Sequence, residues 1–400
     1  MEKSLFILLS FLFLIFHADV NAKKHILILH SYSQEYGWTK LQHDNFIASL
    51  TKSPLSEMEV SVEYLDTKRL KFTDEYQEFF LHYLQEKYKE YTPDAIYVTD
   101  DNALTFFSNH KNALFRNTPV FFSGINNLSF STSLDTSFFT GVYETKEIEP
   151  NIELIRQFSP QTRDIWIVGD GSTTYKSIEA DIKKKIQKFP KYKFHFLSSD
   201  RIDDVIRQLP TSPKSFVLLA TIGAWNDSQA KNLTIKESIT ILKHNPHLIL
   251  CSMEDAYLVG GVIGGYVTSG ANQGLEAAVL VLRYFNGEPI SGIRSIVKSP
   301  NIYMFDHQEV RDSRLILSEY TARNAIILHG QKSFFEKYQQ TVLNTVFILI
   351  ILFLIFLIII YFIALKKKSH LHAVEKQLEE TSAELSLIKN KLALIEHAYE

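Results

Sequence analysis

Cysteine is almost absent from this chain of 400 residues, and its scarcity excludes two kinds of structure. Cys251 is the only cysteine, so the chain forms neither an intramolecular disulfide nor a cysteine-based zinc cluster. It ends the apolar segment 247–251, which favours a buried structural thiol over a nucleophile. The spacing of histidines and carboxylates does not suggest a metal site either. We therefore expect no metal and no other cofactor.

A strong charge imbalance is also missing. The 42 Lys and Arg residues nearly balance the 45 Asp and Glu residues, and the formal net charge is -3. This composition argues against a basic nucleic-acid-binding protein and against an acidic disordered tail. About 300 residues remain once the two hydrophobic ends are set aside, enough for two domains with their own cores.

Long apolar runs are present, and they lie near the two ends of the chain. Residues 1–22 combine an early lysine, an apolar stretch and small residues before position 23. This pattern predicts a secretory signal peptide, with an uncleaved N-terminal anchor as the alternative. Residues 341–365 carry no charge. At 1.5 Å per residue they reach about 37 Å and predict a helix that crosses the membrane.

The charges beside the predicted span indicate its orientation. Three lysines, 366–368, follow residues 341–365 directly, whereas the other flank has mixed charge. Because cytoplasmic flanks carry the excess of Lys and Arg, residues 366–400 are expected in the cytoplasm and 23–340 outside it. We predict a single-pass protein of the bacterial inner (cytoplasmic) membrane with a large periplasmic or extracellular part.

The segment after the lysines repeats apolar residues at spacings of three and four. The repeat consists of Leu371, Val374, Leu378, Thr381, Leu385, Ile388, Leu392 and Ile395. A heptad seam of this length predicts a cytoplasmic coiled-coil helix over 366–400, and through it a homodimer. The alternative is an amphipathic helix that lies on the membrane or on another domain.

The part between the two ends alternates short apolar strands with amphipathic segments, which predicts an α/β fold with parallel sheets. The expected strands form two sets: 25–30, 60–66, 94–100 and 119–125, then 164–170, 192–198, 215–221 and 247–253. We expect two α/β lobes. The first spans 23–145 with a return segment near 265–290, the second spans 146–264, and 291–340 is expected to close the lobes and lead to the membrane.

The carboxyl ends of these strands are the expected binding region, because ligands of parallel sheets bind where the following loops gather. Aromatic residues there could stack on a ring, and carboxylates and amides could hold polar groups. Thr173, Trp225 and Glu254 are the candidates that residue patterns place in the second lobe. The structural alternatives remain open: an Asp at a strand end is often a helix N-cap, and Trp38 could pack the rim of one lobe.

Several segments resemble the ABC-transporter substrate-binding-protein-like sensor family, found as extracytoplasmic domains of bacterial sensor histidine kinases and diguanylate cyclases. The similar segments are 30–38, 64–69, 93–104, 118–127, 140–144 and 260–274, and the similarity runs in order from about residue 24 to 340. It implies a type I periplasmic-binding-protein fold whose two Rossmann-like lobes close on a small molecule. It also implies cleft residues at Tyr32, Trp38, Asp100, Asp101, Ser123, Gly124, Asn126 and Glu144.

The expected function is therefore a membrane-anchored sensor of a periplasmic small molecule. Ligand-induced lobe closure would pass through one membrane helix to the coiled coil, as the input part of a sensor kinase or cyclase type system, with a separate signalling partner possible. The alternative is a membrane-tethered substrate-binding protein that serves an ABC permease. The chain shows no catalytic motif, so we do not expect an enzyme. The carboxylates among the candidates suggest an amine-bearing or polyhydroxylated ligand, and the aromatics suggest a ring.

Overall fold

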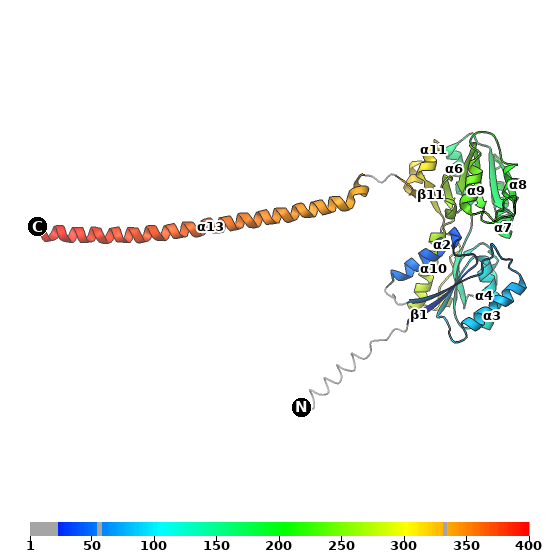
Figure 1. Ribbon diagram of the computed structural model, residues 1–400, viewed down its shortest axis with the longest axis horizontal. Helices are drawn as coiled ribbons and strands as arrows, with labels where there is room; N and C mark the ends of the chain where they lie inside the picture. Colours follow the sequence, from blue (N-terminus) through cyan, green and yellow to red (C-terminus); the bar gives the residue numbers. More distant parts are fainter. Residues whose placement is uncertain (1–22, 54–57, 331–333, 400) are drawn as a thin grey trace, which may run out of the picture. The chain divides into compact units, whose positions relative to one another are not determined.

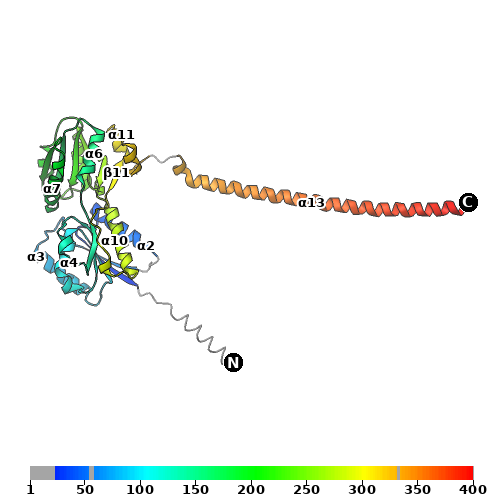
Figure 2. The same cartoon turned by 180° about the vertical axis from the view of Figure 1, so that it is seen from behind.

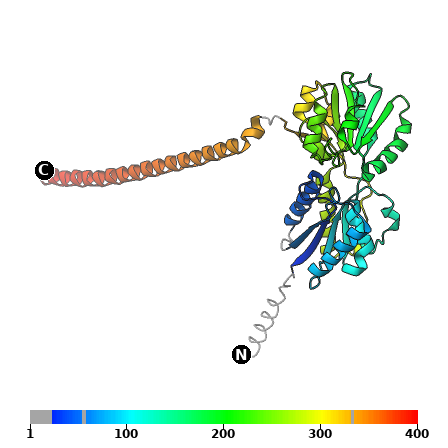
Figure 3. The same ribbon diagram turned by 45° about the vertical axis from the view of Figure 1, so that its right-hand side comes forward.

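The computed structural model describes residues 23–53, 58–330 and 334–399, and these divide into two units, one before and one after Gly330. The predicted signal peptide lies outside the described residues. The first unit holds two sheets, each with its own helices (Figures 1 and 3). The two sheets correspond to the two predicted lobes.

The first lobe is a five-stranded parallel sheet with helices on both faces. Its strands, in spatial order, are β2 (Met58–Tyr64), β1 (Lys24–His30), β3 (Ala95–Thr99), β4 (Val120–Ile125) and β5 (Phe139–Tyr143). Its helices are α2 (Gly37–Thr51), α3 (Asp74–Lys87), α4 (Asp100–Leu114), the short α5 (Phe130–Ser133) and the returning α10 (Gly270–Phe285).

Strand β1 shows why this sheet is covered on both sides. Successive side chains of a strand point to opposite faces. Ile26 and Ile28 join the core under α2 and α10, whereas Leu27 and Leu29 join the core under α3 and α4. Helices α2 and α10 lie side by side in the views of Figures 1 and 2. Helix α10, which follows the strands of the second lobe in the chain, thus packs on the first lobe.

The second lobe is a seven-stranded sheet in which β11 runs antiparallel to β10. Its strands, in spatial order, are β12 (Ala325–Leu328), β11 (Ile302–Asp306), β10 (Gly264–Val267), β9 (Leu248–Ser252), β8 (Ser215–Thr221), β6 (Asp164–Asp170) and β7 (Lys193–Ser199). Its helices are α6 (Ile148–Phe158), α7 (Thr173–Lys185), α8 (Ile202–Ile206), α9 (Ile235–Lys243), α11 (His307–Asp312) and α12 (Glu319–Arg323). Two short 3-10 helices, η1 (Ile186–Lys188) and η2 (Asp255–Tyr257), belong to this lobe, whereas η3 (Ile290–Gly292) packs on the core of the first lobe.

The chain passes between the lobes after β5, after β10, and again before β11. In the last passage Ile296 pairs with Val142 of the first sheet before the chain enters β11. Two boundaries differ from those expected: β10 extends the second lobe beyond residue 264, and segment 291–340 supplies β11 and β12 to the same sheet. Both strands have only four or five residues, and short helices connect them as a parallel pair, so the apolar runs were too short to mark them as strands of this sheet.

The second unit is one helix, α13 (Phe334–Tyr399), of 66 residues. Among the described residues it is the one helix long and apolar enough to cross a membrane. The predicted span 341–365 and the heptad seam both lie on it, without a break in helical structure between them.

Candidate functional site

A small cavity lies between the lobes at the carboxyl ends of their strands. Its walls come from both lobes and from the first passage between them: Tyr32, Tyr36, Trp38, Lys68, Asp100, Asn126, Glu144, Lys146, Thr174, Ile178, Thr221, Glu254 and Tyr257. We call it the inner cavity. Six of the predicted residues, Tyr32, Trp38, Asp100, Asn126, Glu144 and Glu254, line it.

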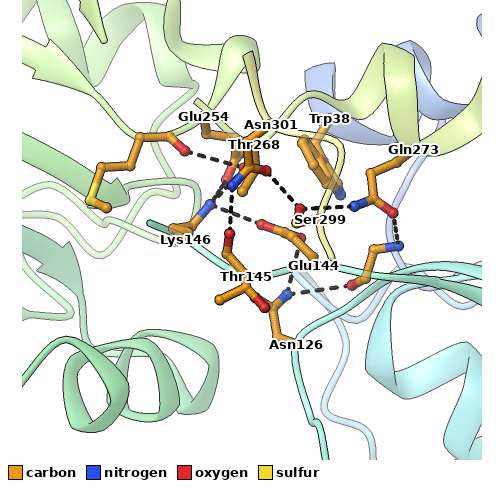
Figure 4. A network of polar contacts seen from close by, with 12 residues as sticks. Trp38, Asn126, Glu144, Thr145, Lys146, Glu254, Thr268, Gln273, Ser299 and Asn301 are labelled. Atoms are coloured by element: carbon orange, nitrogen blue, oxygen red, sulfur yellow. Dashed lines mark hydrogen bonds and ion pairs between the residues drawn. The ribbon is translucent and has the colours of Figure 1, made fainter. Parts of the chain in front are cut away.

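A buried ion-pair network centred on Lys146 forms part of this wall (Figure 4). The Lys146 Nζ atom lies 3.0 Å from Glu144 Oε1 and 3.0 Å from Glu254 Oε2, and it donates to Thr268 Oγ1 at 3.1 Å. Burial opposes the charge of this ammonium, but the two carboxylates outweigh burial and raise the pKa of Lys146. Lys146 is therefore a fixed cation that neutralises carboxylates from both lobes.

The same network ties together the three passages of the chain between the lobes. Lys146 belongs to the first and Thr268 to the second, and Asn301 of the third donates from Nδ2 to the Thr145 carbonyl at 2.8 Å. Ser299 donates to Asn301 Oδ1 at 2.6 Å (Figure 4). A ligand that moves one lobe relative to the other must act on these contacts.

Asp100 is held in a strained backbone conformation at the end of β3. Its φ is 65°, in the left-handed region that non-glycine residues seldom adopt. Its Oδ1 accepts from Trp38 Nε1 at 2.9 Å, and its Oδ2 accepts from Gln42 Nε2 at 3.3 Å. Burial, with a further contribution from Glu144, raises the pKa of Asp100 well above its ordinary value. Strain of this kind concentrates at functional sites.

Gly124, at the end of β4, lies against Asp100 and shares its left-handed backbone, with φ of 71° against 65° at Asp100. A Cβ atom at this glycine would lie 3.0 Å from Asp100 Oδ1 and 3.1 Å from Gln42 Oε1. The glycine therefore leaves room for the carboxylate as well as allowing the conformation. Asp100 does not act as an N-cap, because Thr99 occupies the N-cap position of α4.

The other predicted residues surround the inner cavity or lie away from it. Asp101 accepts from the Asn127 backbone N–H at 3.1 Å, and burial raises its pKa to about 6. Ser123 is buried and shares a 2.6 Å hydrogen bond with the Tyr97 hydroxyl. Thr173 begins α7, and its side chain lies outside the described residues; its neighbour Thr174 lines the inner cavity.

Trp225 differs most from its predicted role. Its side chain is fully buried in the core of the second lobe, packed with β8 and α9, and it does not line the inner cavity. The residue follows a strand end in sequence, but burial of its large apolar ring in the core is more favourable than its exposure in a polar cavity. Trp225 is therefore corrected from a ligand contact to a core residue.

Among the residues of the inner cavity that were missed in the sequence are Lys68, Lys146 and Tyr257. Lys68 follows the carboxyl end of β2, so the rule that selected the other strand ends could have found it. Lys146 lies in the passage between the lobes, where no strand or motif marks it. Tyr257 donates to Glu254 Oε2 at 3.1 Å from a 3-10 helix that the sequence pattern did not indicate.

Comparisons with protein-family models and with curated proteins found no match. Solved structures do match. A conserved domain protein from Vibrio cholerae O1 biovar El Tor has a TM-score of 0.56 at 12% identity, over 76% of this chain and 99% of that chain. A ligand-free, open substrate-binding protein with adhesive properties from Clostridium difficile has a TM-score of 0.55 at 11% identity, over 77% and 100%.

An ABC domain in complex with L-Trp from Streptococcus pneumoniae gives the same values, a TM-score of 0.55 at 11% identity over 77% and 100% of the two chains. Identities this low establish the fold and nothing finer. The two α/β lobes of this chain thus have the fold of ABC-transporter substrate-binding proteins, which confirms the predicted type I periplasmic-binding-protein-like architecture.

Proposed function

We propose that this protein is a membrane-anchored receptor that binds a small molecule between its two lobes and signals through α13. The observation that carries the proposal is the inner cavity, where strand-end residues of both lobes meet a buried ion-pair network. A ligand there would touch both lobes and the first passage between them, whose Lys146 also donates to Thr268 of the second passage. Its differential affinity for the closed form would then bias the position of the lobes.

The chemistry of the wall supports a polar ligand with a ring. Tyr32, Tyr36 and Trp38 offer aromatic faces, and carboxylates and an amide offer hydrogen-bonding groups. An amine-bearing or polyhydroxylated compound fits these groups. The Streptococcus pneumoniae domain was solved with L-Trp, which combines an amine and a ring, and this supports the same class for the present chain.

Binding without turnover is the second part of the proposal. The similar structures from Clostridium difficile and Streptococcus pneumoniae are described as a substrate-binding protein and a ligand-bound ABC domain. The acids of the inner cavity are engaged with Lys146, Trp38 and Tyr257, as expected of groups that hold a structure or a ligand.

Thermal unfolding of the full chain in detergent tests the proposal. The three tryptophans, Trp38, Trp166 and Trp225, all belong to the first unit, so their fluorescence reports the lobes alone. We expect one pool among amino acids, amines, sugars and nucleobases to raise Tm, because a ligand that binds the folded state stabilises it. Asn126→Ala should weaken this binding by about tenfold, whereas the matched surface change Asn324→Ala should not. If no pool raises Tm, the proposed ligand binding is wrong.

Signalling is tested separately from binding. Leu385→Cys in a Cys251→Ser background places one thiol on the heptad seam of α13. We expect the compound found above to change the rate of disulfide cross-linking between two chains. An unchanged rate, together with ligand uptake that persists after deletion of residues 370–400, would favour the tethered substrate-binding protein of an ABC transporter.

A further inference from the structure

A second and larger cavity lies between the lobes beside the inner cavity, with a volume of about 370 Å³. Tyr36 and Lys68 border both cavities. The first lobe contributes loop 33–37 and residues 66–69, and the second contributes mainly 232–236 at the start of α9. We call it the outer cavity. Its volume is in the range of small-molecule sites, which usually begin at about 300 Å³.

The charged groups of the outer cavity do not balance. Three cationic side chains, Lys68, Arg69 and Lys236, face two carboxylates, Glu35 and Asp66. Arg69 engages both acids: its Nε lies 2.6 Å from Asp66 Oδ2 and its Nη2 lies 3.8 Å from Glu35 Oε2. This arrangement leaves the two lysines as the positive surplus.

Neither lysine has an ion-pair partner within the described part of the chain. The Lys68 Nζ atom instead lies 4.7 Å from the ring centroid of Tyr32 and 5.3 Å from that of Tyr36. Such contacts orient the ammonium group of Lys68. Its charge also favours the ionised forms of Asp100 and Glu254 in the inner cavity, but it forms no ion pair with either. Lys236, in the first turn of α9, reaches the cavity from the opposite lobe.

The inner cavity shows the opposite situation. There Glu144 and Glu254 already share Lys146, and Asp100 accepts from Trp38. Each of these carboxylates thus has a partner within the protein. Among the described residues that line the two cavities, Lys68 and Lys236 are the cationic side chains without an ion-pair partner, and both border the outer cavity.

We propose that the outer cavity binds an anionic group, a carboxylate or a phosphate, of the ligand between Lys68 of the first lobe and Lys236 of the second. The inference rests on the proposed function and narrows the ligand to compounds that carry such a group. An anion held by both lysines contacts both lobes at once, so its binding favours the closed arrangement.

Binding of inorganic phosphate and of acetate to the full chain in non-ionic detergent tests the inference. Each anion is titrated at constant ionic strength, and Tm is followed by tryptophan fluorescence. We expect one of the two to raise Tm in a saturable manner, phosphate if the group is a phosphate and acetate if it is a carboxylate. Lys68→Gln and Lys236→Gln should each raise the apparent Kd by about tenfold. Lys191→Gln, an exposed lysine outside the cavity, is the matched control.

The possible outcomes separate this inference from the proposed function. No saturable response to either anion, or an equal response in wild type and Lys68→Gln, overturns the anion site. If an uncharged or cationic compound from the ligand pools still raises Tm, the proposed receptor function stands even though the anion site is wrong. If neither anion and no pool raises Tm, both proposals are wrong.

Discussion

At the scale of single residues, burial decides which acids of the interlobe region carry charge. Asp255 follows Glu254 and is buried, and its Oδ1 atom has no hydrogen-bond partner among the described residues. Burial raises the pKa of Asp255 to about 7. An ionised carboxylate at this position is costly because one oxygen would have no donor to replace water.

This shift predicts a pH-dependent stability. The pKa of Asp255 is about 7 in the folded protein and about 3.9 in the unfolded chain, so folding favours the protonated acid. The contribution of Asp255 to the free energy of unfolding is therefore greatest below pH 4. It falls by about 1.4 kcal/mol per pH unit as pH rises toward 7. Asp255→Asn removes the titrating group, so the variant should gain about 2 kcal/mol relative to wild type between pH 5 and pH 7.

Urea unfolding of the full chain in detergent, followed by tryptophan fluorescence at both pH values, measures this difference. Asp101, whose pKa is raised to about 6, titrates in both proteins and cancels from the comparison. Parallel pH profiles for wild type and Asp255→Asn would contradict the assignment.

At the scale of elements, the passages between the lobes depend on one buried cation. Lys146 and Glu144 follow β5, and Glu254 precedes η2 of the second lobe. Removal of one partner from a buried ion pair leaves an uncompensated charge, which is far more costly than the pair is worth. Substitution of Lys146 should therefore strongly destabilise the connection between the lobes.

Lys146→Met should lower the free energy of unfolding of the first unit by about 3–5 kcal/mol. Lys40→Met is the matched control, because Lys40 Nζ pairs with Asp44 Oδ2 at 2.6 Å on an exposed face of α2. Loss of that exposed pair should cost no more than about 0.5 kcal/mol. Chemical denaturation of both variants gives the comparison, and similar losses would show that the Lys146 network does not stabilise the lobes.

At the scale of the whole molecule, α13 carries an exposed apolar seam. Leu371, Val374, Leu378, Leu385, Ile388 and Leu392 are 50–71% exposed. Pairing of two such seams would bury them, since knobs of one helix enter holes of the other. This arrangement would bring two chains together through residues 366–400, which the flanking charges predict to lie in the cytoplasm.

We predict a dimer of the full chain in detergent that Leu385→Asp converts to a monomer, because a buried carboxylate on the seam is costly. Leu387→Asp is the control: Leu387 is 59% exposed but lies off the heptad seam. Light scattering measures the mass of each protein. Equal effects of the two substitutions would argue that the exposed apolar surface of α13, and not the seam, drives association.

Local patterns were sufficient to predict much of this protein. The eight expected strands of the two lobes are present, because each is a short apolar run bounded by polar turns. The apolar helix near the C-terminus followed from length and composition alone. Asp100 and Glu254, which line the inner cavity, were selected because parallel strands gather their following residues at one edge of a sheet, whereas Glu144 was selected from the family resemblance.

The remaining features depend on contacts between distant parts of the chain. Lys146 meets Glu254 across 108 positions and Thr268 across 122, so no spacing in the sequence indicates the ion-pair network. The partners of β11 and β12, the burial of Trp225 and the two unpaired lysines of the outer cavity are likewise decided by packing. The sequence by itself determined which segments become strands and helices, since periodicity and apolar length are local properties. Only the tertiary structure decided which charges are neutralised and which remain free, because that depends on which side chains meet.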